Sequence, residues 1–84
     1  MIFLIEYDRR LGKLIRLREF TDSARDEAAK ARLDCELVLH RQGLEREVVL
    51  LEAVDRAALE QTHRRYFQTL TQTLDEFARS TSGD

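Results

Sequence analysis

Two histidines and one cysteine are the side chains in this sequence best suited to metal chemistry, but their spacing does not bring them together. A structural zinc site needs about four ligands. Cys35 and His40 lie five residues apart, and on a helix that spacing makes the two side chains diverge. His63 is followed by two arginines and has no second ligand nearby. We therefore expect no metal site and no bound cofactor.

The residues that could act in catalysis also lack a catalytic pattern. Cys35 lies between Asp34 and Glu36, whose negative charges would raise the pKa of the thiol and weaken it as a nucleophile. Glu52 follows an apolar run, where catalytic residues can occur, but a solvated carboxylate at a strand end explains its position. The three glycines are scattered, so there is no phosphate-binding loop. We expect no catalytic residues and no enzyme activity.

Basic residues gather in two places along an otherwise slightly acidic chain. The net charge is −2, so no overall field attracts nucleic acid. One of the two basic groups, in residues 63–67, places cations beside aromatic rings, and the other lies in the N-terminal hairpin. The arginine excess over lysine fits a GC-rich, bacterial-like composition. Nucleic-acid binding is therefore the alternative function, through a basic hairpin with the side chains Arg9, Arg10, Lys13, Arg16 and Arg18.

Size and composition predict one small domain. The chain has 84 residues, of which 43% are hydrophobic and 36% charged. A single cysteine permits no internal disulfide, which favours a reducing compartment. No apolar run approaches the ~18 residues of a membrane span, and the N-terminal run is too short for a signal peptide. We expect a cytoplasmic protein without membrane contact, with a domain at residues 1–79 and a flexible tail at 80–84.

Alternating apolar residues predict a β-hairpin at the N-terminus. Residues 2–7 and 13–20 are the two strands, and residues 8–12 are the loop. Symmetric closure of the loop pairs Tyr7 with Lys13. It also pairs Ile5 with Ile15 and Phe3 with Leu17. One face of the hairpin then carries Phe3, Ile5, Ile15 and Leu17, and the other carries Ile2, Leu4, Leu14, Arg16 and Arg18.

Residues 24–42 have the composition and apolar spacing of a helix. Ser23 and Asp26 resemble a capping box, and Gly43 is placed for a C-cap. Residues 33–39 also alternate with the period of a strand, which would give the order ββαββα. The start and stop signals favour the helix, and the strand stays open as the alternative.

The rest of the chain completes an α+β fold. Residues 45–53 predict a strand, and Asp55 caps a second helix whose apolar stripe runs on through Phe67, Leu70, Leu74 and Phe77. The order is then ββαβα. We predict a three-stranded antiparallel sheet in the order 2-1-3, with two helices that both lie on one face.

This arrangement leaves an apolar sheet face uncovered, which is typical of an interface. We therefore expect a non-enzymatic protein-interaction module that self-associates, as a homodimer, through this face. The stripe at residues 67–77 is the other segment able to cover it, within the chain or between chains. The expected interface residues are Ile2, Leu4, Leu14, Arg16 and Arg18.

Overall fold

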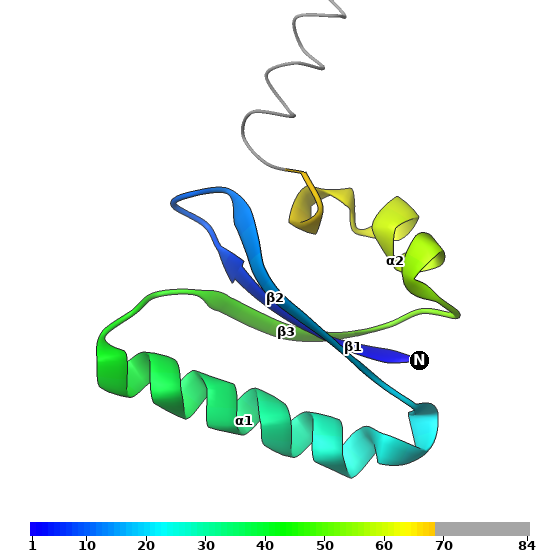
Figure 1. Cartoon of the computed structure of the whole chain (residues 1–84), viewed down its shortest axis with the longest axis horizontal. Coiled ribbons are helices and arrows are strands. Elements are labelled where there is room, and N and C mark those ends of the chain that lie inside the picture. The colour runs from blue at the N-terminus through cyan, green and yellow to red at the C-terminus, as the bar shows by residue number, and fades with distance from the viewer. Residues whose placement is uncertain (69–84) are drawn as a thin grey trace, which may run out of the picture.

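The computed structural model describes residues 1–68 and has the element order ββαβα (Figure 1). The strands are β1 (Ile2–Asp8), β2 (Lys13–Phe20) and β3 (Glu47–Glu52), and the helices are α1 (Arg25–Gln42) and α2 (Arg56–Thr62). Short 3-10 helices, Asp22–Ala24 and Arg64–Tyr66, precede α1 and follow α2. Residues 33–39 lie within α1, so the alternative order ββαββα is wrong.

The three strands form the predicted antiparallel sheet in the order β2-β1-β3. The most apolar strand, β1, lies in the centre, and its residues from Ile2 to Tyr7 are all buried. The hairpin loop closes as expected from its residue types. Asp8 Oδ1 accepts hydrogen bonds from the backbone N–H groups of Arg10 and Leu11, both at 2.9 Å, and Gly12 adopts a φ of 63°.

The predicted register of the hairpin is wrong for two reasons: the loop is one residue shorter than predicted, so that Asp8 pairs with Lys13, and β2 contains a bulge. The pairing shifts between Glu6 and Tyr7, so that Tyr7 lies opposite Leu14 and Glu6 lies opposite Arg16. The extra residue, Ile15, is left exposed. The extra residue interrupts the alternation of faces along β2, so Leu14 lies on the same face as Tyr7 and Leu17. Beyond the bulge, away from the loop, Ile5 pairs with Leu17 and Phe3 pairs with Glu19.

The two helices cover opposite faces of the sheet, not one face as predicted (Figure 1). On one face α2 inserts Leu59 against Phe3 and Ile5. On the other face α1 packs Leu39 against Leu4 and Val48. A buried central strand with apolar residues on both sides needs a cover on each side, and one helix per face supplies it.

The end of α1 follows its sequence signals, whereas its start does not. Gly43 takes the left-handed conformation (φ 68°), and its N–H donates to the His40 carbonyl at 3.1 Å. The next N–H, that of Leu44, donates to the Leu39 carbonyl at 3.0 Å, which completes a Schellman motif. The predicted capping box is absent: Ser23 Oγ contacts Thr21 Oγ1, and no side chain caps the first turn.

The second helix is shorter than the predicted apolar stripe. Asp55 caps it as expected, since its carboxylate accepts the N–H of Ala58 at 2.8 Å. The chain then turns through Arg64–Tyr66 and places Tyr66 against the sheet. The stripe beyond Phe67 and the proposed boundary between residues 79 and 80 lie outside the described residues.

Candidate functional site

The apolar residues of the predicted interface lie inside the molecule. Ile2 and Leu4 are only 2% and 3% exposed, because α1 covers their face of the sheet. Leu14 lies on the other face and packs against the core beneath α2. These three apolar side chains are therefore already packed against the core of their own chain. Only Arg16 and Arg18 of that set are exposed to solvent.

The five cations of the alternative nucleic-acid contact do not form one patch. Arg9 pairs with Glu47 on the side of the sheet that carries α2. Arg16 and Arg18 lie on the side that carries α1, opposite Glu6 and Leu4 of β1. Arg10 and Lys13 are exposed at the hairpin end. A phosphate backbone would need these charges along one path, and the fold divides them between two faces.

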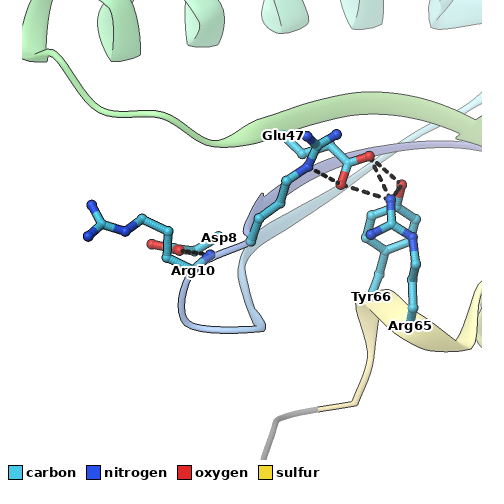
Figure 2. Close-up of polar contacts among 6 residues, drawn as sticks. Asp8, Arg10, Glu47, Arg65 and Tyr66 are labelled. Carbon is cyan, nitrogen blue, oxygen red and sulfur yellow. Dashed lines mark hydrogen bonds and ion pairs between the residues drawn. The ribbon is translucent and has the colours of Figure 1, made fainter.

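A cluster around Glu47 joins β3 to the segment that follows α2 (Figure 2). Arg65 Nη2 donates to both Glu47 carboxylate oxygens, at 2.7 and 2.8 Å, and the Tyr66 hydroxyl donates to Oε1 at 3.0 Å. The Arg65 guanidinium lies 4.3 Å from the centre of the Tyr66 ring, and that ring meets Tyr7 edge-on. Sequence reasoning missed this cluster because its members are distant along the chain.

The contacts of the Glu47 cluster shift the pKa values of Glu47 and Tyr66. Burial raises the pKa of the Glu47 carboxyl, but hydrogen bonds from Arg65, Tyr66 and Arg9 outweigh burial and hold that pKa below its ordinary range. Burial and the hydrogen bond to Glu47 raise the pKa of the Tyr66 hydroxyl. Both shifts keep the partners in their bonded forms at neutral pH. The charged Glu47 carboxylate and the neutral Tyr66 hydroxyl are both stabilised, which favours a structural role for the cluster.

A second polar cluster lies on the other face of the sheet, beneath α1. Glu6 is only 5% exposed, and its carboxylate contacts Arg46 Nη1 at 2.5 Å and Cys35 Sγ at 3.4 Å. Arg46 Nε also lies 3.9 Å from Asp8. Burial, followed by the hydrogen bond to Glu6, raises the pKa of the Cys35 thiol. The thiol is thus kept protonated, in the direction predicted from its acidic neighbours, although Glu6 is a neighbour that the sequence does not indicate.

A groove separates α1 from the edge strand β2. Its volume is about 490 Å³, and Leu4 and Leu39 lie at its apolar base. Arg16 and Arg18 project from the β2 side, and neither forms an ion pair with a residue in the described part of the chain; Arg18 stacks on Phe20 instead, 5.0 Å from the ring centre. The α1 side carries Glu27, Lys30 and Asp34.

The hydrogen-bond ladder identifies which backbone groups are open at the sheet edges. Met1 and Ala53 exchange two backbone hydrogen bonds, so the odd-numbered residues of β1 and β3 form the hydrogen-bonded pairs between these two strands. The N–H and C=O groups of Val48, Leu50 and Glu52 must then point away from β1. By the same alternation, the open groups of β2 belong to Leu17 and Glu19.

No protein-family model, curated protein or solved structure matches this chain. Within residues 1–68, no three His, Cys, Asp or Glu side chains gather where a metal ion could bind. No helix in the same range has the length and apolarity needed to cross a membrane.

Proposed function

We propose that this chain is a non-enzymatic protein-interaction module that forms a homodimer by pairing the outer edges of two β3 strands. The observation that carries the proposal is the composition of this open edge. From Val48 to Leu51 the strand is wholly apolar, and it contains no lysine, arginine or proline. Proteins usually protect an edge strand from pairing with charged residues, lysine above all, or with proline.

Charge supports one register for this pairing. Antiparallel β3 strands that meet at Val49 place Val48 opposite Leu50 of the second copy, and Arg46 opposite its Glu52. The neighbouring register, centred on Leu50, would place Val48 opposite Glu52 instead. The first register pairs Val48 with Leu50 and matches opposite charges at both ends, at the cost of placing Glu47 opposite Leu51.

The position of α1 supports the same dimer. One flank of α1 faces the outer side of β3, since Arg25 pairs with Glu52, and Glu36 and His40 line a pocket with Val48. The helix packs mainly over β1 and β3. With strands about 4.8 Å apart, a two-fold axis at the β3 edge would place the two helix axes about 10 Å apart, which suits direct packing.

The exposed residues of that flank suit a helix pair. Leu33 is 55% exposed although it is a large apolar residue. Arg32 and Glu36 flank it and pair within the helix at 3.2 Å. In an antiparallel helix pair, Arg32 and Glu36 of one copy meet Glu36 and Arg32 of the other, while the two Leu33 side chains pack between them.

Sedimentation equilibrium of the full chain across a micromolar range tests the dimer. Leu33→Glu places two charges in the helix contact and should shift the chain to monomer, whereas Leu11→Glu at the exposed hairpin should not. Leu50→Pro removes an open N–H of β3, and Leu50→Ala is its matched control because the truncated side chain keeps that N–H. A monomer at about 100 μM for the unmodified chain would refute the proposal.

A further inference from the structure

We infer that the other edge of the sheet, β2, is a docking site for an extended protein segment in which acidic and apolar residues alternate. The segment would add to the sheet as a fourth strand, and its acidic side chains would pair with Arg16 and Arg18. This site lies on the edge opposite β3. It is therefore independent of the proposed dimer.

The cations of β2 identify the chemistry of the occupant. Arg16 and Arg18 project from the same face of the strand into the groove beside α1, and neither is ion-paired within the part of the chain that the structure describes. By contrast, the arginines that contact the buried or half-buried acids of the sheet are paired: Arg46 contacts Glu6 and Arg65 contacts Glu47. Two guanidinium groups that are two residues apart and form no ion pair with a described residue match carboxylates at the same spacing on an added strand.

The backbone of β2 sets the register of that strand. Its open groups belong to Leu17 and Glu19, so the added strand bonds at these two residues. Its residues opposite Arg16 and Arg18 then form non-hydrogen-bonded pairs, in which side chains approach most closely. The residue between them lies on the other face, beside the half-buried Leu17. The recognised pattern is acidic, apolar, acidic.

The same charges exclude a second copy of β2 as the occupant. Antiparallel pairing keeps facing side chains on one side of the sheet. In each register that pairs the middle of two β2 strands, Arg16 or Arg18 of one copy faces Arg16 or Arg18 of the other. Basic residues on an edge strand oppose self-pairing in this way, and they favour a partner of opposite charge.

The groove limits how deeply an acidic side chain can enter. Glu27 and Asp34 lie on its α1 side, together with Lys30. A carboxylate that crossed the groove would meet these acids, whereas one that stays on the β2 side meets the two arginines. The arrangement therefore favours a strand that lies along β2 over a compact anion bound inside the groove.

The test is a titration of the full chain with a fluorescein-labelled octapeptide of alternating glutamate and valine, at about 150 mM salt. We expect saturable binding that falls at least tenfold in the double variant Arg16→Glu/Arg18→Glu. A peptide of opposite charge, in which lysine alternates with valine, should bind that variant and not the unmodified chain. Arg10→Glu/Arg41→Glu changes the net charge equally away from the groove and should leave the affinity unchanged.

A second pair of variants tests whether the peptide binds as a strand. Glu19→Pro removes an open N–H of β2, and Glu19→Ala removes the same side chain but keeps the N–H. The proline variant should bind the glutamate–valine peptide at least fivefold more weakly than the alanine variant. Equal affinities, or equal binding of both peptides by the unmodified chain, would overturn the proposal. Binding of a labelled oligothymidylate that depends on Arg16 and Arg18, without peptide binding, would replace it with the nucleic-acid alternative.

Discussion

The Tyr66 hydroxyl donates a hydrogen bond to Glu47 Oε1 at 3.0 Å, and this contact fastens the segment after α2 to the first residue of β3. Arg65 reinforces it with two further bonds to the same carboxylate. The short helix α2 has only seven residues, which is too few for stability by itself. The Asp55 cap closes the first turn of the helix, whereas Leu59 and the Glu47 cluster hold it over Phe3 and Ile5.

Replacing Glu47 with glutamine should lower the free energy of unfolding at pH 7 by about 1–2 kcal/mol, because the charged acceptor of Arg65 and Tyr66 is lost. The pKa of the Glu47 carboxyl is depressed in the folded state. Its contribution is therefore complete above the unfolded-state value of about 4.3 and is lost as the pH falls through the lower folded value.

Urea unfolding from pH 7 to pH 3 would measure this pH dependence. The difference between the unmodified chain and Glu47→Gln should stay constant down to about pH 5 and shrink below it. A difference that grew on acidification would contradict the depressed pKa of Glu47.

Replacing Leu4 with glutamate should unfold the chain, and should not simply dissociate an assembly. Leu4 is buried between β1 and α1, where a carboxylate would find no solvent. Arg18→Glu, at the exposed position opposite Leu4 in β2, is the matched control and should stay folded. Far-ultraviolet circular dichroism distinguishes the outcomes; a folded Leu4→Glu monomer would mean that α1 does not cover this face.

Replacing Gly43 with alanine should cost about 1 kcal/mol through backbone conformation alone. A Cβ built at Gly43 meets no atom within 4 Å, so a steric clash does not contribute. The positive φ of 68° is the source of the strain. Gly43→Asn should cost less, because asparagine tolerates this region better. Thermal unfolding of both variants measures the difference, and equal losses would point to a cause other than φ.

The Cys35 thiol should react slowly with iodoacetamide at pH 7.5 and much faster after unfolding in urea. Burial and the hydrogen bond to Glu6 raise its pKa, so less thiolate is present than in an ordinary cysteine. Glu6→Gln removes the negative charge beside the sulfur and should lower the pH at which alkylation reaches half its maximal rate. An unchanged or higher midpoint in this variant would argue against the contact with Glu6.

Local signals predicted much of this fold. The loop after Asp8, the Gly43 terminus of α1 and the Asp55 cap of α2 each depend on neighbouring residues, so their sequence signatures are sufficient. The position of β1 in the centre of the sheet followed from its apolar content. These features settled the order ββαβα and the strand order 2-1-3.

Features that depend on distant contacts were not predictable in the same way. The bulge at Ile15 has no signal in the sequence, and it moved Leu14 to the opposite face. The side of the sheet on which each helix packs is set by tertiary contacts such as Leu39 with Val48. In the Glu47 cluster, Arg65 and Tyr66 follow Glu47 by 18 and 19 positions along the chain, and a 3-10 turn brings them back to it. No sequence periodicity indicates such a contact.

The central place of β1 determines how the molecule can assemble after synthesis. This strand leaves the ribosome before β2 and β3, and its hairpin with β2 can close within microseconds. Its other edge, from Ile2 to Tyr7, is completed only by β3, about 45 residues later in the chain. Until Glu52 has been translated, the nascent hairpin presents an apolar, unpaired strand. We expect docking of β3 to be slower than closure of the hairpin, because it pairs residues that are distant along the chain.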